Sequence, residues 1–440
     1  MKYAVVGGGI AGLVAAYDLA AHGEVLVHEA DDRAGGKLRT EPFAGTMLDA
    51  APDAFLARRP EAVQLCEELG LRDELEPPAA GNSYLWSRGA LHPVPKGQVL
   101  GVPTDFKALR ASGVLSTLGV ARAALEPWLP GRPLGADETV GEVIRRRFGA
   151  ETAARLVDPL IGGINAGHTD LLSIDCVAPQ IAAAARRDRS LTKALRRLPA
   201  PAPGPVFFTL PGGMQRLVDA LVAAIEARGG EVRTGSAVTS LDQLDADGIV
   251  LATPAFATAP LLRPLAPAAA DVLEGIAYSS VTLVAFAYPD AAVDRPLDAS
   301  GFLVPRPEGL LMTACSWSST KWSHLAGPGR FLLRVSAGRI GDDRAEGMPD
   351  EAVVDQLRDE LATTMGVRGE PLEVAVHRWP RAFPQYAPGH LDRMAAVQAA
   401  LPPRLALAGA LLGGVGIPAC IGTGRAAALR ARGEDLAQPR

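Results

Sequence analysis

Three glycine-rich segments contain the residue types and spacings best suited to chemistry. The first reads Gly7-Gly8-Gly9-Ile10-Ala11-Gly12, follows a short apolar run and fits the pattern G-x-G-x-x-G. In that pattern the glycines permit a tight turn, let a pyrophosphate approach the backbone, and let a helix pack closely on a sheet. Glu29 ends the next apolar segment, where a carboxylate can accept hydrogen bonds from ribose hydroxyls. This context predicts a dinucleotide site, with phosphates bound at the start of a helix.

The second glycine segment, Arg33-Ala34-Gly35-Gly36-Lys37, follows Glu29 closely. Units that bind NAD do not require a second glycine pair here, whereas flavoproteins of the amine-oxidase type often have one. The arginine and the lysine can neutralise phosphate charge. A solvated basic turn would have a similar composition, but the separation of the two glycine clusters favours a flavin dinucleotide.

The third glycine segment lies near the C-terminus. A strand ending at Gly409 is followed by Gly413-Gly414-Val415-Gly416-Ile417 and then by a helical pattern. The positive end of a helix dipole at this point can stabilise negative charge on a reduced flavin. Taken alone, the segment would also suit a simple C-terminal strand–helix unit.

The elements that must position these segments follow from the apolar patterns of the chain. Residues 3–6, 13–21 and 24–29 predict a strand, a helix and a second strand, which together form a dinucleotide-binding unit. Segment 89–103 is predicted to be a loop or a hairpin, and 105–200 to be mainly helical. Further helices are expected at 60–76, 213–228 and 420–431, and further strands at 231–234, 248–252, 278–288, 330–336 and 405–408.

The composition excludes several other classes of protein. A net charge of -5 over 440 residues gives no global positive field that would attract nucleic acid. The four cysteines, at positions 66, 176, 315 and 420, form no CxxC pair, so we expect neither a metal site nor a disulfide framework. No apolar stretch is long enough for a transmembrane helix, and no signal peptide is recognised, so a cytoplasmic location is expected.

Several longer motifs resemble those of one family over essentially the whole chain. They are Gly35–Thr40, Asp49–Leu56, Gly89–Gly97, Gly162–Gly167, Leu172–Ile174, Leu210–Met214, Trp379, Pro384–Tyr386 with Gly389-His390, and Gly413–Ile421. The chain is similar to the HemY-type oxygen-dependent coproporphyrinogen III and protoporphyrinogen oxidases, within the amine-oxidase-like flavoprotein superfamily. Two departures are Ala51-Pro52-Asp53-Ala54, where Gly-Pro-Asp-Ser is common, and Asn165, where a bulky residue is common.

The resemblance implies an α/β fold, the amine-oxidase/PHBH-like two-domain flavoprotein fold. A discontinuous Rossmann-type FAD-binding domain would comprise 1–80, 205–265 and 395–440. Residues 81–204 would form a mainly helical subdomain on the substrate or membrane side, and 266–394 a mixed-sheet substrate domain. The implied FAD-contacting residues are Gly7, Gly8, Gly9, Ile10, Ala11, Gly12, Glu29, Ala30, Arg33, Gly35, Gly36, Lys37, Ala51, Pro52, Asp53, Ala54, Val238, Trp379, Gly409, Val415, Gly416 and Ile417. The resemblance places Val238 in a short strand, Ser236–Val238, whose backbone would meet the adenine, although core packing would equally explain this valine.

The implied activity is FAD-dependent, oxygen-using six-electron oxidation of coproporphyrinogen III to coproporphyrin III in haem biosynthesis, with release of hydrogen peroxide. Protoporphyrinogen IX is the alternative substrate. Two alternative functions are that of an amine or carotenoid oxidoreductase and that of a non-enzymatic FAD-binding protein. Lys96, Arg59 and Arg378 are candidate substrate-binding residues, because a porphyrinogen has anionic propionates around an apolar ring, and an ordinary surface charge is the alternative for each. Asn165 is a fourth candidate, because it stands where a bulky residue is common and would widen the substrate cavity. No catalytic acid or base is assigned. A ferrochelatase-type partner and peripheral membrane contact stay open, and a membrane-associated member would expose an apolar patch within 90–200.

Overall fold

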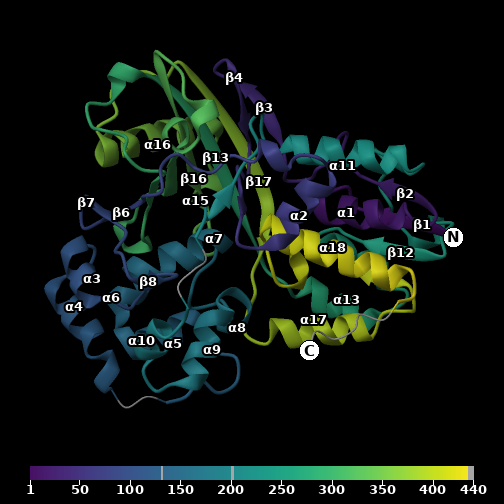
Figure 1. Ribbon diagram of the computed structural model, residues 1–440, viewed down its shortest axis with the longest axis horizontal. Coiled ribbons are helices and arrows are strands. Elements are labelled where there is room, and N and C mark those ends of the chain that lie inside the picture. Colours follow the sequence, from purple (N-terminus) through teal and green to yellow (C-terminus); the bar gives the residue numbers. More distant parts are fainter. Residues whose placement is uncertain (130–131, 200–202, 435–440) are drawn as a thin grey trace. The chain divides into compact units, whose positions relative to one another are not determined.

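The computed structural model describes residues 1–129, 132–199 and 203–434, and the chain divides into two units (Figure 1). The first unit comprises Met1–Pro77, Pro205–Ala277 and Leu391–Arg440, and the second comprises Pro78–Gly204 and Tyr278–His390. The sequence assigned 266–277 to the mixed-sheet domain, but these residues group with the first unit, where 267–274 form a helix. The segments expected to form the helical subdomain and the mixed-sheet domain lie together in the second unit.

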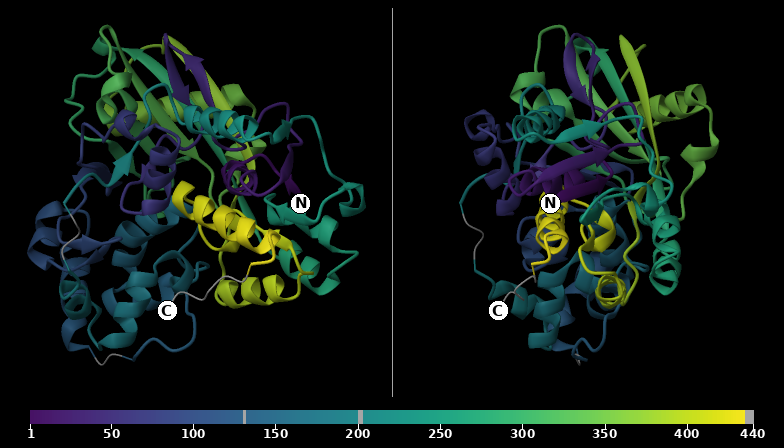
Figure 2. Two further views of the ribbon diagram at one scale, coloured as in Figure 1. Left: turned by 45° about the vertical axis from the view of Figure 1, so that its right-hand side comes forward. Right: turned by 90° about the vertical axis from the view of Figure 1, so that its right-hand side faces the viewer.

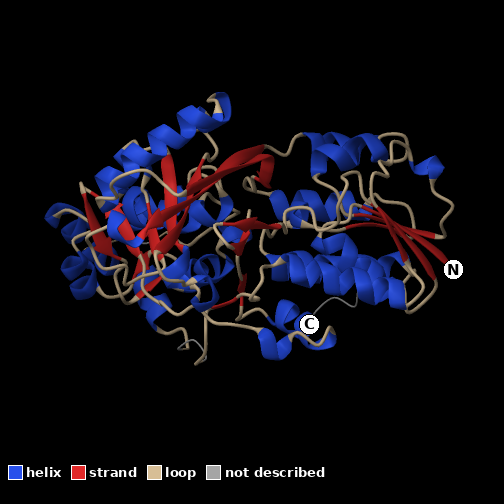
Figure 3. Ribbon diagram, turned by 90° about the horizontal axis from the view of Figure 1, so that it is seen from above, coloured by secondary structure: helices blue, strands red, loops and turns tan. Residues whose placement is uncertain are grey.

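A five-stranded parallel sheet forms the centre of the first unit (Figure 3). Its apolar strands follow the order β11-β2-β1-β12-β18, so three distant stretches of chain contribute to one sheet. Short runs of buried Val and Leu are typical of parallel strands covered on both faces. The strands are β1 (Lys2–Val6), β2 (Glu24–His28), β11 (Glu231–Arg233), β12 (Gly248–Leu251) and β18 (Leu405–Leu407).

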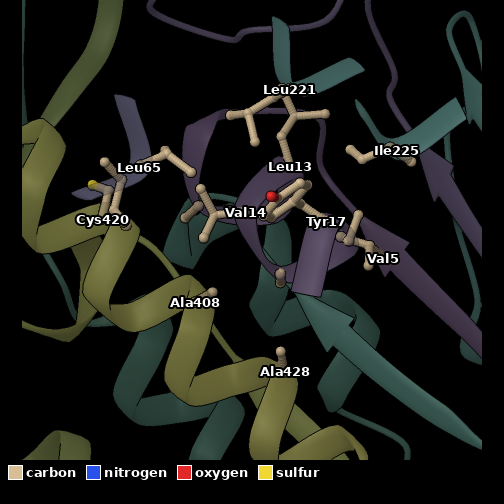
Figure 4. Packing of buried hydrophobic residues seen from close by; sticks show 14 of the residues in the cluster. Val5, Leu13, Val14, Tyr17, Leu65, Leu221, Ile225, Ala408, Cys420 and Ala428 are labelled. Atoms are coloured by element: carbon tan, nitrogen blue, oxygen red, sulfur yellow. The ribbon is translucent and has the colours of Figure 1, made fainter. Parts of the chain in front are cut away.

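Three helices pack together over this sheet: α1 (Ile10–Leu19), α11 (Gln215–Ala227) and α18 (Ile417–Ala431). Figure 2 shows α18, in yellow, beside the purple N-terminal elements. Buried side chains from all three helices interdigitate, among them Leu13 and Val14 from α1 and Leu221 from α11 (Figure 4). Gly424 allows α18 to approach α1 closely, because a Cβ at this position would collide with the carbonyl oxygen of Ala11. This packing fixes the starts of α1 and α18, which carry two of the three glycine segments.

The first unit has several smaller elements. A hairpin of β3 and β4 follows the second glycine segment, and β5 pairs with β10. Helix α17 begins at the boundary of the two units. The elements are β3 (Thr40–Phe43), β4 (Thr46–Asp49), β5 (Phe55–Leu56), α2 (Pro60–Glu68), η1 (Arg72–Glu74), β10 (Phe207–Phe208), η4 (Leu241–Gln243), α12 (Ala255–Leu262), α13 (Pro267–Glu274), α17 (His390–Ala399) and η8 (Ala410–Leu412).

The second unit contains a mixed seven-stranded sheet in the order β17-β13-β16-β15-β14-β6-β7. All neighbours are antiparallel except β14 and β6. Helix α16 (Asp350–Met365) contributes Val353, Leu357 and Leu361 to the core on one face of the sheet. The strands are β6 (Tyr84–Ser87), β7 (Ala90–Pro93), β13 (Tyr278–Pro289), β14 (Gly301–Leu303), β15 (Met312–Trp317), β16 (Arg330–Ala337) and β17 (Glu373–Pro384).

The helical part of the second unit has its own apolar core. This helical part includes the π-helix η3 (Ala153–Gly162). π-Helical turns are rare in proteins, and those that occur are often found at functional sites. The other short elements of the unit are β8 (Gln98–Val99), β9 (Val102–Pro103), α3 (Phe106–Ser112), α4 (Thr117–Ala124), η2 (Glu126–Trp128), α5 (Val140–Phe148), α6 (Ala150–Thr152), α7 (Gly163–Asn165), α8 (Ile174–Val177), α9 (Pro179–Arg187), α10 (Leu191–Arg196), η5 (Asp290–Ala292), η6 (Arg306–Glu308), α14 (Ser318–Lys321), η7 (Ser323–Leu325) and α15 (Arg344–Gly347).

Exposed apolar side chains occur in this helical part. Leu118, Leu125 and Trp128 are 82%, 52% and 79% exposed. They lie within 90–200, where the sequence predicts an apolar patch for a membrane-associated member. Within the described residues, no helix has the length and apolar character needed to cross a bilayer. Peripheral membrane contact stays a prediction, which sedimentation with lipid vesicles tests.

Two local expectations differ from the structure. The helix expected at 60–76 ends at Glu68, and Gly70 then adopts a positive φ of 73° before the short turn η1. The short strand expected at Ser236–Val238 is absent from the described residues. The Ser236 N–H donates to the Glu29 carbonyl at 2.7 Å and the Ser236 Oγ lies 2.9 Å from the His28 Nδ1 of β2, but Ala237 and Val238 pair with no strand.

Candidate functional site

The first glycine segment forms the turn between β1 and α1. Gly7 has a φ of 105°, and its N–H donates to the His28 carbonyl at 2.8 Å, which ties the turn to β2. A Cβ at Gly12 would collide with the Gly7 carbonyl oxygen, so glycine is required there for packing. In contrast, a Cβ at Gly9 would meet no atom within 4 Å. Gly9 therefore faces open space at the start of α1, where the pattern predicts a pyrophosphate.

Glu29 lies directly after β2 and is 8% exposed. Its Oε2 accepts a hydrogen bond from the Gly8 N–H at 2.6 Å, and its Oε1 accepts one from the Asp31 N–H at 2.9 Å. The two bonds fix the carboxylate beside the glycine turn. A carboxylate has about four lone-pair sites, so each oxygen can accept a further bond from a ribose hydroxyl.

Arg33 organises the second glycine segment. Its guanidinium donates to the carbonyl oxygens of Ala34, Gly36 and Leu38 at 3.1, 2.5 and 3.0 Å. The Gly35 N–H donates to the Gly8 carbonyl at 2.8 Å, which joins the two glycine segments. The sequence predicts that Arg33 neutralises phosphate charge, but in the structure its donors bind the backbone of the loop. Arg33 therefore acts first on the shape of this loop.

Part of the Lys37 side chain, in the second glycine segment, is exposed to solvent, but many protein atoms surround its ammonium group. Burial by surrounding protein atoms lowers the pKa of its ammonium group, and the nearby Cys420 thiol raises it. Burial raises the pKa of Cys420 to about 11, an effect that Lys37 opposes. Because Lys37 and Cys420 interact, the second glycine segment lies close to the start of α18. An anion here would gain from a positive charge that water solvates incompletely.

The third glycine segment connects β18 to α18. The Gly409 N–H donates to the Thr423 Oγ1 at 2.9 Å, so α18 holds the end of the preceding strand. Gly416 is the N-cap of α18, as Gly9 is of α1, and neither helix start has a side-chain cap. Both helices therefore retain backbone donors for an anion. Val415 is half-buried at this start and Ile417 is 6% exposed.

The other residues of the first unit that are expected to contact the cofactor differ in their exposure to solvent. Ala51, Pro52, Asp53 and Ala54 are half-exposed and lie in an irregular segment after β4. Ala30 is exposed beside Glu29, and Val238 is half-buried in the irregular segment that Ser236 joins to Glu29.

Asp49 was missed as a positioning residue by the sequence analysis, although it lies in one of the motifs. It is 7% exposed, and its Oδ1 accepts from the Thr40 Oγ1 at 2.6 Å and from the Met214 N–H at 2.8 Å. These bonds join the β3–β4 hairpin to the start of α11. The Asp49–Met214 pair spans 165 residues of sequence, so no local pattern could have revealed it.

The candidate cations differ in what they already bind. Arg59, in the first unit, forms an ion pair with Glu61 at 2.6 Å, and this bond raises the pKa of Arg59. Arg378, on β17, donates to Asp350 and to the carbonyls of Ala345 and Met348. Lys96 is exposed, and within the described residues its side chain forms no hydrogen bond or ion pair. Of the three candidate cations, Lys96 is therefore the one that no carboxylate of the described residues neutralises.

The remaining two candidates lie in the second unit. Trp379 is half-buried on β17, opposite Val281 of β13. Asn165 is 5% exposed, and its Nδ2 donates to the Ile161 carbonyl at 2.9 Å. The Asn165 side chain is thus turned toward its own helix, so a direct contact with substrate would require that bond to break.

The geometry of the first unit fits a dinucleotide cofactor. Open space beside Gly9, two helix starts without side-chain caps, a fixed carboxylate at Glu29 and a poorly solvated cation at Lys37 occur together. Each supplies a group that a diphosphate or a ribose requires. Such a fold and site define a flavin-dependent oxidoreductase.

The chain belongs to the family of flavin containing amine oxidoreductases, whose family model matches residues 10–431. A coproporphyrinogen III oxidase of Bacillus subtilis is 34% identical, with 96% of each chain covered. One of Mycobacterium bovis is 38% identical, covering 97% of this chain and 96% of the relative. A chloroplastic protoporphyrinogen oxidase of Nicotiana tabacum is 29% identical over 95% of this chain and 83% of its own length.

The fold agrees with a solved structure. A crystal structure of a protein from Exiguobacterium sp. 255-15 superposes with a TM-score of 0.86 at 29% identity, and 97% of each chain is covered. The predicted fold class is therefore confirmed, and the expected flavin oxidoreductase class is confirmed as well.

Proposed function

We propose that the protein catalyses the FAD-dependent oxidation of coproporphyrinogen III to coproporphyrin III in haem biosynthesis. Molecular oxygen would accept the six electrons and be released as hydrogen peroxide. The observation that supports this substrate most strongly is the likeness, over nearly the whole length, to two relatives named coproporphyrinogen III oxidase, at 34% and 38% identity.

The residues of the first unit are proposed to hold FAD. The N–H groups after Gly9 and the Lys37 ammonium would bind the diphosphate, and the Glu29 carboxylate would accept bonds from the adenosine ribose. Arg33 would keep the loop around Gly36 in the shape that receives the cofactor. When bound, the flavin supplies the redox chemistry that amino-acid side chains lack, by accepting hydride from the substrate and passing electrons to oxygen.

The rest of the protein has to bind and orient a large apolar ring with anionic arms. An apolar surface with a few cations at its rim would suit such a substrate. Lys96 is proposed as one of these cations, because Arg59 and Arg378 already bind carboxylates of the chain. No side chain is assigned as a proton acceptor.

Protoporphyrinogen IX is the second candidate substrate, and the likeness to the tobacco enzyme favours it. The two porphyrinogens differ in charge, because coproporphyrinogen III carries four propionates and protoporphyrinogen IX carries two. A protein adapted to the first should discriminate through cations that the second leaves without a partner.

Anaerobic stopped-flow reduction of the purified protein tests the proposal. We expect coproporphyrinogen III to bleach the flavin absorbance much faster than protoporphyrinogen IX at equal concentration. The opposite preference would assign the protein to the second substrate. If neither porphyrinogen bleaches the flavin while dithionite does, the proposed activity is wrong and only the flavoprotein class stands.

A further inference from the structure

The segment that joins η3 to the following loop has an unusual backbone. Ala166 has φ 43° and ψ 36°, the left-handed region that a residue with a Cβ rarely adopts. It directly follows the single helical turn α7 (Figure 1) and the π-helix η3. Such a conformation is strained and persists only where the surrounding structure holds it in place. The contacts of 163–167, here called the α7 loop, show how it is maintained.

Three successive carbonyl groups of the α7 loop are held by three different parts of the second unit. The Asn165 carbonyl accepts from the Gln385 Nε2 at 3.1 Å, and the Ala166 carbonyl accepts from the Ile340 N–H at 2.8 Å. The Gly167 carbonyl accepts from the Arg306 Nη2 at 2.6 Å. Each donor comes from a segment more than a hundred residues away in sequence, so the loop is fixed by tertiary structure rather than by its own propensity.

Arg306 is itself held by a buried carboxylate. The Arg306 Nε lies 3.2 Å from the Asp158 Oδ2, with side-chain exposures of 18% and 6%. The Asp158 Oδ1 accepts from both the N–H and the Oγ1 of Thr169, at 2.9 and 3.0 Å. Asp158 therefore links the π-helix on one side of the α7 loop to Thr169 on the other, and Arg306 closes the link onto Gly167.

A second buried arginine, Arg339, pairs with a different carboxylate. The Arg339 side chain is 9% exposed, and its Nη1 donates to the Val304 carbonyl at 3.3 Å. Burial, together with the neighbouring charge of Arg306, lowers the pKa of Arg339 to about 10, although Asp158 and Asp342 oppose this shift. Asp158 is thus the carboxylate that contacts Arg306, whereas Asp342 pairs with Arg339 at 3.9 Å.

We propose that Asp158 and Arg306 act as positioning residues that hold the α7 loop in the conformation needed to contact the substrate. The conformation buries the Asn165 side chain and leaves Ile164 58% exposed. Ile164 is then the side chain of the loop that contacts an apolar ring, and Asn165 supports the loop from within. This inference rests on the proposed oxidation of a porphyrinogen.

The test measures loop order and catalysis separately. In Arg306→Gln, we expect amide hydrogen exchange in a peptide covering 163–172 to rise at least about tenfold, because local opening needs fewer contacts to break. We expect kcat/KM for coproporphyrinogen III to fall about 10- to 100-fold, since displacement of a substrate-contacting group by about 1 Å has that effect. Flavin content and the rate of flavin reduction by dithionite should match wild type.

Two further variants control for folding. Arg306→Lys keeps the positive charge but lacks the guanidinium group that reaches Asp158 and the Gly167 carbonyl together. Its amide exchange and its kcat/KM should therefore lie between those of wild type and Arg306→Gln. If Arg306→Gln fails to fold, Thr169→Val removes one donor to Asp158 without changing any charge and should raise exchange in the same peptide. The matched control is Arg186→Gln, because Arg186 forms an exposed two-bond pair with Asp175 in the same unit.

The outcomes are distinct. Faster exchange with unchanged kcat and KM would overturn the proposal, because the loop would then be ordered without serving the substrate. Slower turnover with unchanged exchange would overturn it as well, because Arg306 would not be what holds the loop. If wild-type protein oxidises no porphyrinogen, the proposed function fails and the substrate role of the loop fails with it, while the exchange data still report whether Arg306 holds the loop.

Discussion

Lys96 differs from the other candidate substrate cations because no carboxylate of the described chain neutralises it. We expect Lys96→Met to raise the KM for coproporphyrinogen III about fivefold, the effect of losing an exposed ion pair worth about 1 kcal/mol. Flavin content should not change. Steady-state kinetics of Lys96→Met beside Lys107→Met, an exposed lysine on α3 of the same unit, provides the measurement. Equal KM values in both variants and in wild type would eliminate Lys96 as an anchor.

Glu29 offers a second test at a single residue. In Glu29→Gln the carboxamide nitrogen would face either the Gly8 N–H or the Asp31 N–H, both of which are donors. Loss of a charged acceptor costs about 1.5–3 kcal/mol, so the cofactor should bind roughly 10- to 100-fold more weakly. The ratio of flavin to protein absorbance after gel filtration measures retention. Glu24→Gln, an exposed change at the start of β2, should retain flavin, and equal retention in both variants would contradict the assigned role.

The β1–α1 turn allows fold and cofactor binding to be separated at the scale of an element. Gly9→Ala adds a Cβ to open space at a backbone conformation that alanine accepts, with φ -71° and ψ 171°. We expect this variant to fold but to lose flavin, because the methyl group occupies the place of the pyrophosphate. Gly12→Ala puts the same methyl group against the Gly7 carbonyl and should prevent normal folding of the first unit.

Circular dichroism melts of the two variants, each compared with wild-type protein stripped of flavin, measure the difference. Gly9→Ala should melt within a few degrees of the stripped protein, whereas Gly12→Ala should melt far lower or be insoluble. Full flavin occupancy in Gly9→Ala would contradict the position given to the pyrophosphate.

The same element explains why part of the structure could be predicted from sequence. β1, α1 and β2 form a local unit, so apolar periodicity and the glycine spacing sufficed to place them. The strand expected at Ser236–Val238 was wrong, because Ser236 bonds to Glu29 and His28 while the two residues after it pair with no strand. The bonds of Asp49 to Met214 and of Arg306 to Gly167 were not predicted, since each joins positions more than a hundred residues apart. Chemistry-bearing motifs were therefore readable, whereas the residues that position them were not.

At the scale of the molecule, the first unit is assembled from three stretches of chain. β18 pairs with β12 and β11 pairs with β2, so residues from both ends complete one parallel sheet. The two helix starts that are expected to bind the cofactor lie together because α18 packs against α1. A site built in this way exists only when the whole first unit is folded, which joins cofactor retention to the stability of distant segments.

The proposed reaction also has a consequence for the whole molecule, because hydrogen peroxide attacks cysteine thiolates. The four cysteines are free and distributed over both units. Burial raises the pKa of Cys66 and Cys176 to about 12 and that of Cys420 to about 11, and it raises the pKa of fully buried Cys315 as well. Each thiol therefore stays protonated, and slow to react, across the neutral range.

We expect native protein at pH 8 to react with iodoacetamide far more slowly than the same protein in guanidinium chloride, where all four thiols should be alkylated. Peptide mass mapping after timed labelling measures each site. Several rounds of turnover with coproporphyrinogen III should leave the four thiols unoxidised, because the fraction of thiolate, which sets the rate of attack by peroxide, is very small in the folded state. Rapid labelling or sulfinic acid formation at any one cysteine of the native protein would show that its thiol is not protected by burial.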